Sequence, residues 1–136
     1  MSKNNWRATD LALYTNDLEW LTADEASRAY ALALLYAAKN RYGLDISTVA
    51  GIERIVFGDD ILAAKAWLNS HVGVAEQLVV VFDEASCFRC DAKFFLKNWQ
   101  DLFVPSRDDV VIYSMVSPLT LFFCHENEIE AGQRIV

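Results

Sequence analysis

The sequence predicts an α+β domain with an N-terminal helical half followed by a small, mostly antiparallel sheet (strand, helix, strand, strand) packed on the helices. Apolar residues recur at helical spacing before Gly73, and short β-branched runs predominate after it. The 136 residues contain only five Gly and two Pro, so no linker divides the chain. We therefore expect one globular domain over residues 1–136.

The longest predicted helix spans residues 23–42. Thr22 and Glu25 have the spacing of a capping box, in which each side chain binds the backbone amide of the other residue. Gly43 is placed to end the helix in a left-handed conformation. Because both sides of the segment are apolar, we expect this helix to be central and covered on more than one side.

Two shorter helices are predicted before Gly73. Ser47 is positioned to cap a helix that runs to about Phe57, and Asp59 to cap a second helix over residues 60–71. The apolar residues within residues 5–20 do not recur at a regular spacing, so we expect this segment to be only partly helical. The adjacent carboxylates of Asp59 and Asp60 are expected to diverge in space.

The second half predicts three main strands and one helix. The apolar run 77–82 is typical of an interior strand covered on both faces, and residues 110–115 and 119–124 are two further strands. Ser86 or Asp91 could cap a helix that ends near Phe103, before Pro105. Residues 128–130 alternate in polarity and predict a short edge strand.

Composition narrows the class of partner. The formal net charge is −7 and the isoelectric point is about 4.7, whereas binding to nucleic-acid phosphates requires a basic surface. The N-terminal residues do not form a secretory signal, and the longest apolar run, residues 29–38, is too short to span a membrane. Three cysteines without an export signal indicate reduced thiols and a cytoplasmic location.

Negative charge gathers in the second half of the chain. The simpler interpretation is a solvated face that keeps the protein soluble. The alternative is a surface that binds a basic protein partner, because opposite potentials accelerate association. The residues assigned to that face are Asp108, Asp109, Glu126, Glu128 and Glu130.

Cys87 and Cys90 form a C-x-x-C motif between an apolar strand and a predicted helix, where a helix N-terminus would lower a thiol pKa. A thiol-disulfide enzyme is therefore the alternative function, although two ordinary cysteines that occur together by chance are the favoured interpretation, because the context that would confirm a redox motif is incomplete. A zinc site from these cysteines, Cys124 and His125 is disfavoured, because neighbouring residues of a strand point to opposite faces. We expect His125 to be a hydrogen-bonded residue at a strand end. No metal, cofactor or catalytic residue is predicted.

Two segments carry a resemblance to known proteins. Residues 99–112 and 121–132 resemble the C-terminal pattern D-D-x-x-I … L-F-x-x-H-E-x-E-x-x-x-G of a small bacterial (Neisseria-type) family, which is similar to immunity proteins of contact-dependent growth-inhibition loci. The resemblance covers about a third of the chain. It implies a cytoplasmic protein that neutralises a secreted toxin by direct binding, without catalysis.

Three hypotheses follow from the sequence. The first is an immunity-type binding protein that uses its acidic surface against a basic toxin domain. The second is the thiol-disulfide enzyme described above, and the third is a homodimer formed through exposed aromatic residues.

Overall fold

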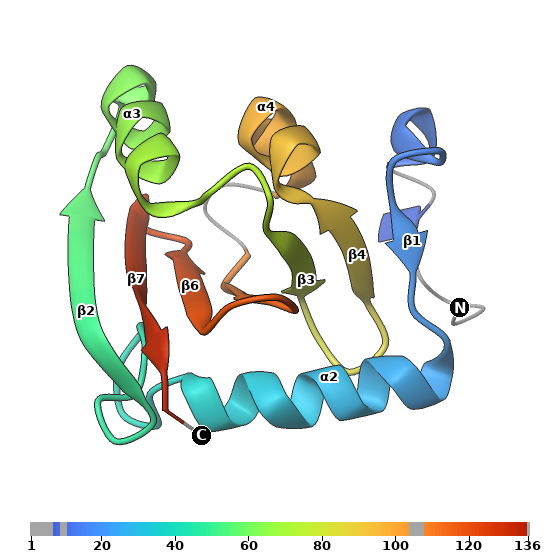
Figure 1. The fold of residues 1–136 in the computed structure, drawn as a ribbon, viewed down its shortest axis with the longest axis horizontal. Coiled ribbons are helices and arrows are strands. Elements are labelled where there is room, and N and C mark those ends of the chain that lie inside the picture. Colours follow the sequence, from blue (N-terminus) through green and yellow to red (C-terminus); the bar gives the residue numbers. More distant parts are fainter. Residues whose placement is uncertain (1–6, 9–10, 104–107, 136) are drawn as a thin grey trace.

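The computed structural model describes residues 7–8, 11–103 and 108–135. Within them the chain forms a seven-stranded antiparallel sheet with helices on both faces (Figure 1). The strand order is β1-β4-β3-β5-β6-β7-β2. The helical elements are η1 (Ala12–Tyr14), α2 (Ala23–Tyr36), α3 (Ile61–His71) and α4 (Ala92–Leu102). The strands are β1 (Glu19–Trp20), β2 (Val49–Val56), β3 (Gln77–Val81), β4 (Cys87–Asp91), β5 (Val110–Ser114), β6 (Leu119–Cys124) and β7 (Glu128–Arg134).

This architecture corrects the predicted one. The fold is a sheet-rich α+β domain in which strands and helices interleave along the chain, so the expectation of a helical N-terminal half is wrong. Two strands, β1 and β2, precede α3, and β4 precedes α4. The sheet is also much larger than the predicted one.

Strand β2 accounts for most of the error. The apolar residues Val49, Ile52 and Ile55 are three apart, a spacing that suits one face of a helix. In the structure the segment instead pairs along its length with β7. A register shift between Ala50 and Glu53 marks a bulge at Gly51, whose φ of 64° suits glycine. The bulge adds one residue to β2 that has no partner on β7. Val49 and Ile52, three residues apart on either side of the bulge, can therefore share one face of a strand.

Helix α2 begins as predicted and ends early. Thr22 accepts a hydrogen bond from the Glu25 amide, and the Glu25 carboxylate accepts one from the Thr22 amide, which completes the capping box. The helix stops at Tyr36 instead of residue 42, because the next residue, Ala37, is extended and bridges Leu44.

The expectation that α2 is covered on more than one side is also wrong. Its buried residues form a single stripe, whereas Leu34 and Leu35 remain 47% and 49% exposed. The helix therefore lies across one face of the sheet with its other side open.

Two layers of core lie on opposite faces of the sheet. Figure 1 shows α3 and α4 on one side of the strands and α2 on the other. The α3 and α4 layer contains Leu68, Phe95 and Trp99, packed on alternate strand residues such as Ile112. The α2 layer is formed by the intervening residues, such as Val111, against the buried stripe of α2. Because both faces are covered, the central strands β3, β5 and β6 are apolar at successive positions.

The remaining elements follow the sequence closely. Strands β3, β5 and β6 lie where they are predicted, and Asp91 caps α4 by accepting a hydrogen bond from the Phe94 amide. Strand β7 is longer than the predicted edge strand and is interior, since β2 occupies that edge. Pro105, the predicted stop after α4, lies outside the described residues. Among the described helices, none has the length and apolar character needed to cross a membrane.

Candidate functional site

A cavity of about 190 Å³ lies where the end of α4 and the start of α3 approach the β6–β7 turn. Its apolar lining comes from Phe57, Ile61, Trp99, Phe103 and Phe123. A cavity of roughly 150 Å³ is large enough to hold a benzene ring. The cavity therefore has room for one aromatic or branched aliphatic group.

One residue that lines the cavity has a polar side-chain atom without a hydrogen-bond partner. Trp99 is 5% exposed, and its indole Nε1 has no hydrogen-bond partner among the described residues. A buried N–H without an acceptor is destabilising by about 1–3 kcal/mol.

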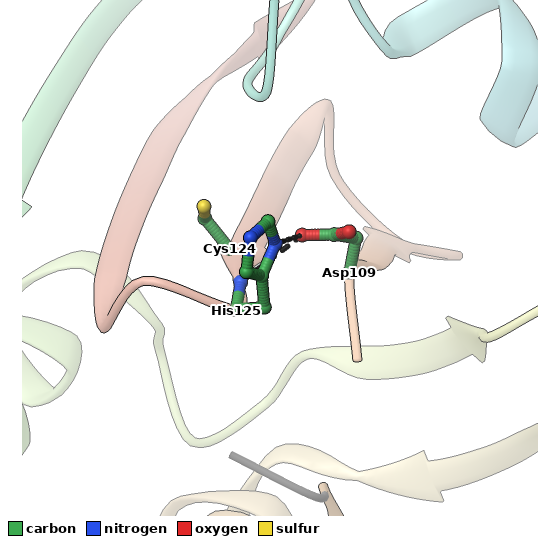
Figure 2. A group of neighbouring side chains, drawn as sticks. All are labelled: Asp109, Cys124 and His125. Atoms are coloured by element: carbon green, nitrogen blue, oxygen red, sulfur yellow. Dashed lines mark hydrogen bonds and ion pairs between the residues drawn. The ribbon is translucent and has the colours of Figure 1, made fainter. Parts of the chain in front are cut away.

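A polar cluster adjoins the cavity. The His125 amide donates to Asp109 Oδ1 over 3.0 Å, and His125 Nδ1 lies 2.9 Å from the same oxygen. Cys124 completes the group, because its sulfur, a ring nitrogen of His125 and a carboxylate oxygen of Asp109 all lie within 4.8 Å of one another. Figure 2 shows the three side chains converging, with the imidazole between the sulfur and the carboxylate in this view.

The proximity of Cys124 and His125 differs from the sequence-based expectation. We expected adjacent residues of a strand to point to opposite faces. Strand β6 ends at Cys124, however, and His125 lies in a turn closed by a hydrogen bond from the Asn127 amide to the Cys124 carbonyl. The alternation of a strand no longer applies there. His125 is nevertheless the hydrogen-bonded strand-end residue that the sequence predicts.

The electrostatics of this cluster oppose a nucleophilic thiol. Burial, together with the nearby carboxylates, raises the pKa of Cys124, although the Glu126 amide donates to its sulfur over 3.4 Å. An attacking thiol generally needs a lowered pKa. The hydrogen bond to Asp109 raises the pKa of His125. The electrostatics of this cluster therefore do not favour attack by Cys124.

Two of the five acidic residues predicted to face a partner are buried. Asp108 forms an ion pair with Arg7 at 2.8 Å and is 7% exposed. Glu130 is 5% exposed, lies 2.9 Å from Arg41 and accepts a hydrogen bond from the Leu44 amide. These two carboxylates hold distant parts of the chain together.

The other three predicted acidic residues lie around the β6–β7 turn. The Glu128 side chain is 17% exposed and is paired with Arg54 in β2. The Asp109 side chain is 32% exposed, and that of Glu126 is 65% exposed. Only Glu126 and part of Asp109 are thus open to a partner.

Sequence reasoning missed Asp59 and Asp60 as neighbours of this turn. Both are exposed and directly precede Ile61, which lines the cavity. The Asn127 side chain donates to the Gly58 carbonyl over 3.0 Å and joins their loop to the β6–β7 turn. This contact spans 69 residues and leaves no local signal in the sequence. We use the name acidic rim for Asp59, Asp60, Asp109 and Glu126.

The C-x-x-C motif occupies a different place from the one expected. Cys87 and Cys90 both lie within β4, buried on opposite faces of the sheet, and all three cysteines are free thiols. Desolvation, with a smaller contribution from a neighbouring aspartate, raises the pKa of each of these two thiols to about 12. The thiol-disulfide alternative requires adjacent and activated sulfurs, which this placement does not provide.

Comparison of the chain with models of protein families and with curated proteins finds no match.

Proposed function

We propose that this protein is a non-catalytic, cytoplasmic binding protein of the immunity type, which neutralises a basic toxin domain by direct contact through the acidic rim. The observation that carries the proposal is the apolar cavity of about 190 Å³, whose lining residues Ile61 and His125 directly adjoin the exposed acids Asp60 and Glu126 in the chain. Protein interfaces concentrate their binding energy in a few buried anchors surrounded by polar contacts. A cavity of this size with an acidic rim suits an aromatic or aliphatic anchor flanked by Lys or Arg.

Net charge supports the same partner chemistry. The chain carries −7, so it attracts a basic protein at long range, and such attraction raises the association rate. A nuclease toxin is basic where it contacts phosphates, and an acidic protein could occupy that surface. The proposal places this contact at the acidic rim and not at Asp108 or Glu130, whose carboxylates are buried in ion pairs with Arg7 and Arg41.

The test uses the product of the reading frame immediately upstream of this gene, which the proposal predicts to be a basic toxin domain. We expect it to bind the full chain, and co-expression to restore growth of cells that produce the toxin. In the double variant Asp59→Lys, Glu126→Lys, the association rate should fall by roughly tenfold at low salt, with a weaker dependence on salt.

The control with the same change of net charge is Asp24→Lys, Glu84→Lys, which reverses two exposed acids, one in the first turn of α2 and one in the β3–β4 turn, the loop beside α2 in Figure 1. This variant should associate at nearly the wild-type rate. Absence of binding to the upstream domain would contradict the proposal. If the rim and control variants reduce the association rate equally, the acidic rim is not the contact surface.

A further inference from the structure

We propose that Cys124, His125 and Asp109 form a binding site for one borderline-soft divalent cation of the zinc type. The site goes beyond the proposed function and does not require a protein partner. Its three side chains come from two segments, the residues that precede β5 and the end of β6 (Figure 2).

The donor set selects the class of ion. A thiolate favours zinc-like ions over Mg²⁺ or Ca²⁺, imidazole suits the same ions, and a carboxylate can complete the site. Three protein ligands leave one position of a tetrahedral ion for water or a further side chain. The Glu126 carboxylate is one candidate, since one of its oxygens lies within 4.8 Å of the Cys124 sulfur and its side chain is exposed.

The distances fit after a small adjustment. Bonds of about 2.0–2.3 Å around a tetrahedral zinc ion place ligand atoms about 3.3–3.6 Å apart. Asp109 Oδ1 and His125 Nδ1 are 2.9 Å apart, and the Cys124 sulfur is within 4.8 Å of the ligand atoms of both residues. Closure therefore requires the sulfur to approach by no more than about 1 Å and the nitrogen and oxygen to separate by about 0.4 Å.

Backbone hydrogen bonds already orient two of the ligands. The His125 amide holds the Asp109 carboxylate, and the Glu126 amide donates to the Cys124 sulfur. Binding replaces two protons by the ion: the Cys124 thiol and the His125 Nδ1 each release a proton to solvent as the ion binds the sulfur, Nδ1 and the Asp109 carboxylate. No oxidant or reductant is involved.

A second group near the same sulfur is less suitable. Cys124, Glu126 and Glu128 also bring their ligand atoms within 4.8 Å of one another. Glu128 is, however, engaged by Arg54 in an ion pair across β7 and β2. Coordination there would break that ion pair, whereas the group with His125 and Asp109 sacrifices only one hydrogen bond.

The experiment titrates Co²⁺ into the full chain after treatment with a chelator and reduction of the thiols. We expect one Co²⁺ per chain and a thiolate-to-cobalt charge-transfer band in the near-ultraviolet, which Zn²⁺ then displaces. The band should be absent in Cys124→Ser and present in the control Cys90→Ala, which removes a thiol from β4. Circular dichroism of each variant verifies its fold.

If Cys124→Ser does not fold, His125→Asn and Asp109→Asn provide the test, because each removes one donor near the surface. Each should weaken Co²⁺ binding by about tenfold or more. The absence of a charge-transfer band in the wild type, its persistence in Cys124→Ser, or unchanged affinity in both His125→Asn and Asp109→Asn would overturn the site. None of these results depends on the toxin, so failure here is distinct from failure of the proposed function.

Discussion

Glu130 is the residue whose role changes most between sequence and structure, and its replacement gives a measurable test. We expect Glu130→Ala to lower the free energy of unfolding by about 2–5 kcal/mol. The variant leaves the fully buried Leu44 amide without its acceptor, which costs about 1–3 kcal/mol. The lost γ-methylene adds about 0.8 kcal/mol. The Arg41 side chain is 42% exposed and can return to water, so loss of the ion pair adds at most about 1 kcal/mol.

Glu130→Gln separates the hydrogen bond from the charge. Its amide oxygen can still accept from the Leu44 amide, so we expect a loss of only about 1 kcal/mol. Glu126→Ala is the control, since its side chain is 65% exposed and a surface substitution usually changes stability by less than about 0.5 kcal/mol.

Urea unfolding at neutral pH measures all three variants. With a slope of about 1–3 kcal/mol per molar, a loss of about 3 kcal/mol moves the midpoint by about 1–3 M. Equal midpoints for Glu130→Ala and Glu126→Ala would refute the structural role of Glu130. A Glu130→Gln variant as unstable as Glu130→Ala would show that charge, and not the Leu44 hydrogen bond, determines the effect.

Three further predictions concern acid stability, packing and thiol reactivity. Hydrogen bonds from the Thr22 amide and the Arg89 guanidinium lower the pKa of Glu25 from 4.5 to about 2. The ionised carboxylate therefore stabilises the fold above pH 4.5, and this contribution is lost as the pH falls through 2. Urea midpoints of Glu25→Gln should therefore decline less steeply than wild type over that range. Gly132→Ala should lower the free energy of unfolding by about 1–3 kcal/mol, because the added Cβ would lie 2.5 Å from a valine methyl and 2.9 Å from a backbone oxygen. Gly73→Ala is the control: its added Cβ has its nearest neighbour at 4.0 Å, so this variant should unfold at no lower urea concentration than wild type. Cys87 and Cys90 should react with a thiol reagent only after urea is added, and rapid labelling of either in the folded protein would contradict their burial.

Local signals in the sequence predict several elements of this fold. The capping box at Thr22 and Glu25 sets the start of α2, because both partners lie within one helical turn. The end of α2 depends on distant contacts: Arg41 and Leu44 bind Glu130, which lies in β7. A glycine stop signal at Gly43 could not reveal that the preceding residues leave the helix earlier.

The candidate site shows the same division between local and distant determinants. The identities of Cys124 and His125 are visible in the sequence, but their convergence depends on where β6 ends. Asp108 belongs to a predicted acidic cluster, yet its partner Arg7 is 101 residues away. The sequence shows how many carboxylates a segment contains. It does not show which of them form ion pairs within the fold.

The position of β2 at the edge of the sheet affects how the protein is assembled during synthesis. This strand pairs only with β7, and Arg41, just before β2, is 89 residues from its partner Glu130. At translation rates of about 5–20 residues per second, β2 emerges roughly 5–20 s before its partner strand. Glu53 and Arg54 place charged side chains in the middle of β2 during the time before β7 is synthesised. Charged side chains on an unpaired strand disfavour its β-pairing with other nascent chains.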